Sequence, residues 1–297
     1  MQVGFIGIGN MGWGMAANVV KAGFAVTVFD ADAGRGPRFS REYGCNFASQ
    51  LDGLAASDVI VTMLPTGHIV RQVLLDGAEG GLAGALKPGT IVVDMSSSEP
   101  VGTQTLGKDL AGKGVTLIDA PVSGGVVRAN AGTLAIMIGT DDFGALERIR
   151  PLLLAMGDRL FETGGPGSGH AMKALNNYVA AACFTATAEA LLIGGRFGLD
   201  QGKMVEIINA STGRNFHTDV VMKEHVVGKK FATGFAVGLL AKDVKIAADL
   251  GKAVGLDAPL SRMVCDRWAF ARDRLGANRD NTEAILAWND NLEPQAE

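Results

Sequence analysis

Cysteine and histidine are scarce in this 297-residue sequence. The three cysteines, Cys45, Cys183 and Cys265, are odd in number and have no paired spacing, which predicts free thiols in a reducing, cytoplasmic compartment. None of them lies in a pattern typical of a nucleophile. The four histidines show no ligand spacing with cysteines or carboxylates, so the sequence predicts no metal site.

Clusters of positive charge and uninterrupted apolar runs of membrane length are also absent from the sequence. The formal net charge is −4 and no run of lysine and arginine is longer than Lys229-Lys230, which argues against a surface for nucleic acid or an anionic membrane. The most apolar helical pattern, which follows Lys173, is interrupted by two threonines and Glu189. Residues 1–6 lack the features of a signal peptide. We therefore expect neither a nucleic-acid nor a membrane partner.

What the chain contains is the composition of an ordinary folded protein, with 47% apolar and 20% charged residues and enough length for two domains. Near-uniformly apolar segments, separated by helix-sized segments, predict a parallel sheet that is covered by helices on both faces. These apolar segments are residues 2–8, 25–29, 58–64, 90–94, 116–119 and 133–138.

Beyond Gly169 the patterns are helical only. Helices are predicted at residues 202–210, 220–227, 237–254, 259–275 and 282–288, in addition to one at 143–156.

The predicted fold class is therefore α/β, with a Rossmann-type, doubly wound parallel sheet in a domain of residues 1–163 and an all-α domain of residues 164–297. A long helix at about residues 168–198 joins them. Because this helix is apolar on nearly every side, we expect it to be buried all round. The tail, residues 291–297, is predicted to be frayed.

The first apolar segment ends in a glycine-rich turn that leads into a helical pattern. The turn contains Gly7, Gly9, Asn10, Met11 and Gly12, with the spacing G-x-G-x-x-G. Gly7 permits the tight turn, Gly9 lets a pyrophosphate approach the backbone at the helix N-terminus, and Gly12 lets helix and strand pack closely. In a βαβ context this motif predicts a dinucleotide-binding site.

Asp30 follows the second predicted strand and bears on the choice of cofactor. A carboxylate at this point accepts hydrogen bonds from the adenosine ribose and repels a 2′-phosphate, so the sequence favours NAD. Arg35 and Arg38 follow closely and could bind such a phosphate, which keeps NADP as the less favoured alternative. Asp30 could also be a plain turn residue.

Three predicted strands end in segments that would line a binding crevice, because the carboxyl ends of parallel strands meet at one edge of the sheet. Met63-Leu64-Pro65-Thr66 could pack on the cofactor. Residues 94–98 offer hydroxyl groups, although a serine there could instead cap the following helix. Residues 119–125 end in Ser123-Gly124-Gly125, whose N–H groups and hydroxyl could form a nest for a carboxylate; taken alone, this triplet is more often a turn.

Two polar residues interrupt the apolar connecting helix near its start. Lys173 and Asn177 stand four residues apart and so project from one helix face. The positive end of the helix dipole and partial burial both disfavour a cation, so we expect the pKa of Lys173 to lie below its solution value of about 10.4. Such a lysine can act as a general acid or base. The plainer alternative is a lysine whose stem packs and whose ammonium reaches water.

The residues alone leave three features open. His170, three residues before Lys173, could relay a proton or have a packing or capping role. Arg128 could face an acidic substituent of a substrate or only solvent. The run Arg214-Asn215-Phe216-His217 could close over a substrate, or form a domain or subunit contact.

Taken together, the motifs resemble those of the β-hydroxyacid dehydrogenase family, which contains 3-hydroxyisobutyrate dehydrogenase and tartronate semialdehyde reductase. The resemblance covers essentially the whole chain. It rests on four motifs in the same order, at residues 4–12, 119–125, 169–177 and 241–243.

The resemblance implies roles for particular residues. Lys173 would be the catalytic acid or base with Asn177 as its partner, and Ser123-Gly124-Gly125 would hold the substrate carboxylate. Family members that use NADP often carry Asn-Arg in place of Asp30-Ala31, which supports NAD. Cofactor contacts are implied for Leu64, Pro65, Ser97, Phe235 and Lys242.

We therefore expect an NAD-dependent β-hydroxyacid dehydrogenase that acts reversibly on a small 3-hydroxy acid, such as 3-hydroxyisobutyrate, or on its semialdehyde. A second copy of such an apolar chain is the expected partner, in a homodimer or homotetramer. One alternative is an NADPH-dependent semialdehyde or glyoxylate reductase of the same family. Another is a nucleotide-binding module without catalysis.

Overall fold

The computed structural model describes residues 1–76 and 81–289, so the tail predicted to be frayed lies outside the described residues. The chain divides into two compact units, Met1–Lys173 and Ala174–Glu297. The domain boundary predicted before Gly164 stays a prediction.

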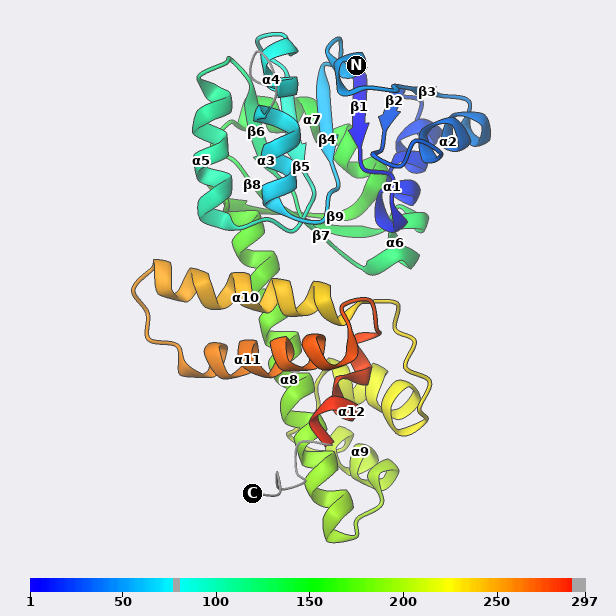
Figure 1. Ribbon diagram of the computed structural model, residues 1–297, viewed down its shortest axis with the longest axis vertical. Coiled ribbons are helices and arrows are strands. Elements are labelled where there is room, and N and C mark those ends of the chain that lie inside the picture. The colour runs from blue at the N-terminus through cyan, green and yellow to red at the C-terminus, as the bar shows by residue number, and fades with distance from the viewer. Residues whose placement is uncertain (77–80, 290–297) are drawn as a thin grey trace. The chain divides into compact units, whose positions relative to one another are not determined.

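Unit 1 contains one sheet of nine strands within the described residues (Figure 1). Its order is β3-β2-β1-β4-β5-β6-β8-β7, and β9 pairs with β8. The strands are β1 (Gln2–Ile6), β2 (Ala25–Phe29), β3 (Asn46–Phe47), β4 (Val59–Thr62), β5 (Ile91–Asp94), β6 (Thr116–Asp119), β7 (Val122–Ser123), β8 (Leu134–Gly139) and β9 (Gly157–Gly164).

The predicted parallel sheet is confirmed from β3 across to β6, where every pair of neighbours is parallel. The sheet changes direction at β8, which is antiparallel to β6 and β7. The chain between β7 and β8 is too short for the crossover that a parallel pair needs. Strand β9, which is parallel to β8, was not predicted from the sequence, because its residues are largely exposed and polar rather than uniformly apolar.

Helices cover both faces of this sheet. The helices of unit 1 are α1 (Asn10–Lys21), α2 (Arg35–Tyr43), η1 (Leu51–Leu54), α3 (Gly67–Leu75), α4 (Gly81–Ala85), α5 (Pro100–Ala111), α6 (Gly125–Ala131) and α7 (Phe143–Met156).

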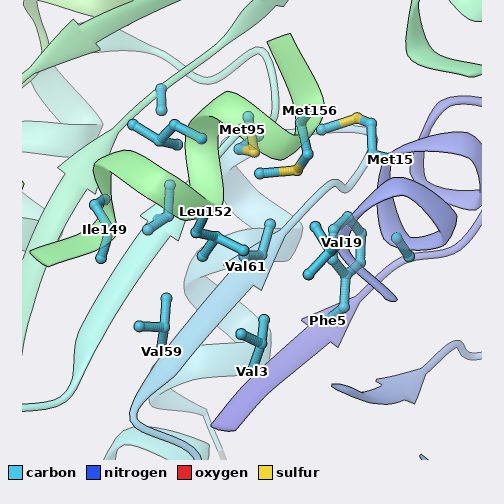
Figure 2. Packing of buried hydrophobic residues seen from close by; sticks show 14 of the residues in the cluster. Val3, Phe5, Met15, Val19, Val59, Val61, Met95, Ile149, Leu152 and Met156 are labelled. Atoms are coloured by element: carbon cyan, nitrogen blue, oxygen red, sulfur yellow. The ribbon is translucent and has the colours of Figure 1, made fainter. Parts of the chain in front are cut away.

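Successive side chains along a strand point to opposite faces of the sheet, and each face contacts a different set of helices. Val59 and Val61 of β4 belong to a core cluster with α1 and α7, and Figure 2 labels both among other members of this cluster, with Val61 near Leu152. Ile60, between them, belongs to the opposite cluster with α3, α4 and α5. Because both faces are apolar, successive side chains must all be apolar, which is the sequence pattern that predicted these strands.

Unit 2 is all-helical in the part that the structure describes, as predicted from the sequence. Its core contains Phe184, Trp268 and Trp288, and the Trp268 indole donates a hydrogen bond of 3.0 Å to Thr185 Oγ1. The helices are α8 (Ser168–Phe197), which begins in unit 1, α9 (Gln201–Asn209), the π-helix η3 (His217–Val227), α10 (Val237–Ala253), α11 (Pro259–Leu275), η4 (Asn281–Glu283) and α12 (Ala284–Asn289).

Helix α8 is not buried all round, so that prediction was wrong. Ala181 and Phe184 are buried, but Val179, Ile193 and Phe197 are 57%, 70% and 84% exposed. An apolar sequence makes burial favourable but does not supply neighbours on every side of a 30-residue helix. The exposed apolar residues therefore mark a face without cover in a single chain.

By length and composition, α8 could also cross a membrane. The core helix of a globular protein has the same composition, so this is weak support for a membrane segment. The buried face of α8 packs in the core of unit 2 through Ala188 and Leu191 as well as Phe184.

Candidate active site

The turn from β1 into α1 forms a cradle of backbone. Gly7 has a φ of +93°, and a Cβ added to Gly12 would lie 1.9 Å from the Gly7 carbonyl oxygen, so neither position accepts another residue without a shift. A Cβ added to Gly9 would meet only Arg35 Nη1, at 3.5 Å. Among the described residues no side chain caps α1, which leaves its first N–H groups for an anion. This cradle fits the pyrophosphate of a dinucleotide.

Asp30 lies beside this cradle at the end of β2. Its Oδ2 accepts the N–H of Ile8 at 2.9 Å, and its Oδ1 accepts the N–H of Asp32 at 2.9 Å. Arg35 Nη1 lies 3.5 Å from Asp30 Oδ2 and Arg35 Nε lies 3.3 Å from Asp32 Oδ2. Arg38 stacks over the Trp13 ring, 4.8 Å from its centroid. Both arginines that could have bound a 2′-phosphate therefore already have contacts.

A buried carboxylate, Asp94, organises two of the strand-end segments. Its Oδ1 accepts Thr62 Oγ1 at 2.8 Å and the N–H of Ser96 at 3.0 Å, and its Oδ2 accepts Ser98 Oγ at 2.8 Å. Ser96 Oγ in turn accepts the N–H of Leu64 at 2.9 Å. The segments that carry the predicted cofactor residues Leu64, Pro65 and Ser97 are therefore joined through one side chain.

A second buried carboxylate, Asp119, holds the start of α8. It accepts the N–H of Gly167 at 2.7 Å and the N–H of His170 at 2.9 Å, two groups that have no partner within the helix. A Cβ on Gly169 would lie 2.8 Å from Asp119 Oδ2 and 2.4 Å from the Met137 carbonyl oxygen. Burial raises the pKa of Asp119, while His170 and the two N–H groups act in the opposite direction.

The predicted carboxylate nest lies in the same segment as Asp119. Ser123 is half-buried, and Gly124 and Gly125 are exposed with φ values of +138° and +66°. Helix α6 follows the nest and is fixed to α1, because Asn18 Nδ2 donates to the Ala129 carbonyl oxygen at 2.8 Å. Through α6, the nest is thus joined to α1, the helix that follows the dinucleotide cradle.

Lys173 is half-buried in α8, one turn after His170. Asn177, four residues further on, is buried, and its Nδ2 donates to Asp243 Oδ2 at 2.6 Å. Lys242 Nζ lies 3.3 Å from Asp243 Oδ1. Asp243 therefore orients two residues, Asn177 and Lys242, that were predicted to belong to the site.

Phe235 lies in a fixed loop of unit 2. Its carbonyl oxygen accepts the N–H of Asn281 at 2.9 Å, and the preceding Gly234 N–H donates to Asp280 Oδ2 at 2.9 Å. The Phe235 ring packs, partly buried, against the core of unit 2. The contact of this ring with a cofactor stays a prediction.

Three buried carboxylates hold the segments of the candidate site, although the sequence predicted no role for them. Asp94, Asp119 and Asp243 are 1%, 1% and 3% exposed. The available signal was that each stands within or directly after an apolar pattern, where an acid is buried only when several donors surround it. Asp119 and Asp243 stand in two of the four motifs, but the motifs do not reveal which groups these carboxylates hold.

Two family models together match nearly the whole chain. The family model of the NAD-binding domain of 6-phosphogluconate dehydrogenase matches residues 2–165. A second model, described as NAD-binding of NADP-dependent 3-hydroxyisobutyrate dehydrogenase, matches residues 167–288.

Individual relatives match over nearly the whole chain. The sequence is 36% identical to 2-(hydroxymethyl)glutarate dehydrogenase of Eubacterium barkeri, over 96% of this chain and 94% of the relative. It is 33% identical to NAD-dependent L-serine dehydrogenase of Pseudomonas aeruginosa, over 94% and 95%. The solved structure of Mycobacterium tuberculosis 3-hydroxyisobutyrate dehydrogenase with L-serine superposes with a TM-score of 0.86 at 32% identity, over 97% and 98% of the two chains.

The dinucleotide cradle and these matches define the chain as an NAD(P)-dependent oxidoreductase that acts on a CH–OH group. Within that class, the chain belongs to the 3-hydroxyisobutyrate dehydrogenase family of β-hydroxyacid dehydrogenases. The resemblance inferred from the four sequence motifs is thereby confirmed.

Proposed function

We propose that the chain is an NAD-dependent dehydrogenase of small 3-hydroxy acids in which Lys173 is the general acid and base. The observation that carries this proposal is the double use of residues 119–125. The first residue of this segment, Asp119, accepts the N–H groups at the start of the helix that bears Lys173. The last three form the nest proposed for the substrate carboxylate. One segment thus holds the first turn of the helix that bears Lys173 and also contains the proposed anchor.

The mechanism follows from these positions. The nest would hold the carboxylate through the N–H groups of Gly124 and Gly125 and the hydroxyl of Ser123, which orients the neighbouring carbon. Lys173 Nζ would take the hydroxyl proton during oxidation and return it during reduction. Asn177, held by Asp243, would donate to the same oxygen. When bound, the nicotinamide supplies the hydride acceptor or donor.

The names of the relatives suggest the substrate class. Serine, 3-hydroxyisobutyrate and 2-(hydroxymethyl)glutarate share the unit HOCH₂–CHR–COO⁻ and differ only in R, which is an ammonium, a methyl or a carboxyethyl group. We propose a 2-substituted 3-hydroxypropanoate as the substrate. The nest would bind the shared carboxylate, and other side chains would contact R.

The position of Arg128 favours, as a second candidate, a substrate whose substituent R is acidic. A Cβ added to Gly124 would lie 2.6 Å from Arg128 Cδ, so the Arg128 stem runs along the nest. Its guanidinium forms no hydrogen bond or ion pair with the residues that the structure describes. Arg128→Ala should raise KM for 2-(hydroxymethyl)glutarate about 10-fold or more and leave KM for 3-hydroxyisobutyrate unchanged. Equal changes for both acids would reject this role.

NAD is proposed over NADP because Asp30 occupies the end of β2 and Arg35 is paired with Asp30 and Asp32. A 2′-phosphate there would meet two carboxylates. We expect kcat/KM to favour NAD by at least about 10-fold. A preference for NADP would support the reductase alternative.

A second copy of the chain is the proposed partner. Large apolar side chains are exposed on unit 2, among them Ile193, Phe197 and Ile207, which are 70%, 84% and 58% exposed. Isolated globular units rarely leave so much apolar surface uncovered. Light scattering should give at least a dimer, and Phe197→Asp should shift the distribution towards the monomer.

The principal test replaces Lys173 by alanine. Turnover of the best acid in a panel of 3-hydroxy acids should fall about 100-fold or more, with Kd for NADH unchanged. Lys108→Ala, at an exposed lysine on α5, is the matched control. Near-normal turnover of the Lys173 variant would remove this residue from the chemistry.

A further inference from the structure

A histidine that the mechanism does not use lies between the two buried carboxylates of unit 1. His170 is 1% exposed. Its Nδ1 lies 2.8 Å from Thr103 Oγ1 and 3.8 Å from Asp119 Oδ2, and its Nε2 lies 3.6 Å from Asp94 Oδ2. The ring therefore bridges Asp94, at the end of β5, and Asp119, at the end of β6.

The surroundings favour one position for the hydrogen of this ring. Among the residues that the structure describes, Nε2 has no hydrogen-bond partner, and Asp94 Oδ2 lies 3.6 Å from it. A bare nitrogen lone pair there would oppose a carboxylate oxygen, which favours the hydrogen on Nε2. Nδ1 then accepts from the Thr103 hydroxyl, which has the Glu99 carbonyl oxygen, at 3.1 Å, as a second acceptor. In this tautomer the hydrogen on Nε2 lies on the side of the ring that is nearest Asp94.

The two carboxylates that the ring joins hold different parts of the proposed site. Asp94 holds residues 95–98 and, through Ser96, the N–H of Leu64. Asp119 holds the first turn of α8, one turn before Lys173. His170 belongs to that turn and contacts Asp94 directly. It is therefore the link between the strand-end loops and the helix that carries the proposed catalytic amine.

We propose that His170 is a positioning residue that fixes the register of Lys173 relative to the loops at residues 63–66 and 95–98. The proposal rests on the function proposed above. A small displacement of a catalytic group lowers the rate of the chemical step much more than it lowers binding. Loss of the link should therefore lower kcat and leave affinity for the cofactor intact.

Stability alone is a poor explanation for this arrangement. Two carboxylates and an imidazole are buried together, and an apolar core of the same volume would avoid the cost of their desolvation. The polar contacts also form a continuous series, from Thr62 and Ser98 through Asp94 to His170 and Thr103. Directional contacts of this kind specify geometry.

The test compares three replacements of His170. Leucine removes both nitrogens, asparagine places a polar group near the position of Nδ1, and glutamine places a donor near the position of Nε2. We expect kcat to fall about 10-fold or more in His170→Leu and His170→Asn, and to recover to within about 3-fold of wild type in His170→Gln. The deuterium isotope effect on kcat should rise in the two slow variants, and Kd for NADH should stay within about 2-fold.

His217→Leu is the control for loss of a buried histidine, because His217 is 8% exposed and lies outside the array. The inference would be overturned by His170→Leu turnover within about 2-fold of wild type, or by equal losses in His170→Leu and His170→Gln. If His170→Leu does not fold, the contrast between asparagine and glutamine decides in the same way. Lys173→Ala is assayed in parallel. Loss in Lys173→Ala with no loss in the His170 variants rejects only this inference, whereas inactivity of the wild type rejects both proposals.

Discussion

Two histidines of this chain are both more than nine-tenths buried, yet their surroundings are opposite. His170 in unit 1 is surrounded by Thr103, Asp94 and Asp119. His217 in unit 2 lies edge-on to Phe184, with ring centroids 5.3 Å apart. Among the residues that the structure describes, no side chain forms a hydrogen bond with its nitrogens, and the backbone of Ala180 is the polar group that acts on the ring. Burial of a titratable ring does not by itself indicate a functional site. What distinguishes the two is whether polar partners fix the direction of the ring.

The two surroundings also differ in how they affect the charge of a buried group. Burial lowers the pKa of His217 to about 4, so this ring is neutral at pH 7 and behaves as a flat apolar group. In the other cluster, burial raises the pKa of Asp119, and His170 and two N–H groups counteract that rise. The polar cluster can keep a charge in the interior because its members compensate one another.

Asp119→Ala should have the largest effect, because it removes the acceptor for two N–H groups of α8 and a neighbour of His170. Breaking a buried, hydrogen-bonded charge cluster costs about 3–5 kcal/mol of the free energy of unfolding. Hydrogen exchange should accelerate in peptides that cover residues 164–173, and kcat should fall with it. Asp109→Ala is the control, because the Asp109 side chain is 39% exposed and pairs with Arg71 at the surface. Its loss should lower the free energy of unfolding by less than about 1 kcal/mol.

Slow exchange at Gly167 and His170 in the Asp119 variant would contradict the role of Asp119 as the anchor of α8. Asp119→Asn should lie between the wild type and Asp119→Ala, because an amide has one acceptor oxygen in place of two. Loss of activity with unchanged exchange would place the effect of Asp119 elsewhere than in the anchoring of the helix.

The difference between the two clusters explains what the sequence could predict. The parallel strands were predicted because two apolar faces require uniform apolar residues, as at Val59, Ile60 and Val61. The cradle was predicted because Gly7 and Gly12 leave space that a Cβ would fill. Both are local properties of a few neighbouring residues.

The buried carboxylates could not be predicted in the same way. Asp94 and His170 are 76 residues apart by their numbers, and their contact exists only after the sheet and α8 have formed. Asn177 and Asp243 are similarly remote. A sequence shows that an acid stands in an apolar pattern, but its partners come from distant segments. The uncovered face of α8 is the converse case, since apolar residues do not reveal whether a neighbour is present.

His217→Leu should have the next largest effect, seen as a change in pH dependence. The unfolded chain binds this proton near pH 6.5 and the folded chain only near pH 4, so unfolding takes up a proton between these values. The free energy of unfolding of the wild type should therefore fall by about 3 kcal/mol more than that of the variant between pH 7 and pH 4. Urea unfolding at several pH values measures this difference. Parallel pH profiles would show that His217 is protonated in the folded chain.

The smallest effect comes from a matched pair of threonines, one in each cluster. Thr103 is the partner of His170 Nδ1, and Thr185 accepts the hydrogen bond from the Trp268 indole. Each hydroxyl also donates to the carbonyl oxygen four residues earlier, Glu99 or Ala181, so each replacement by valine keeps the shape and removes both contacts of the hydroxyl. Each should cost about 1–2 kcal/mol of the free energy of unfolding. Only Thr103→Val should also lower kcat, by about 3-fold, because only its partner ring lies between the proposed catalytic helix and the strand-end loops. Equal kcat values in the two variants, at equal loss of stability, would mean that the polar cluster around His170 contributes no more to catalysis than the aromatic core of unit 2.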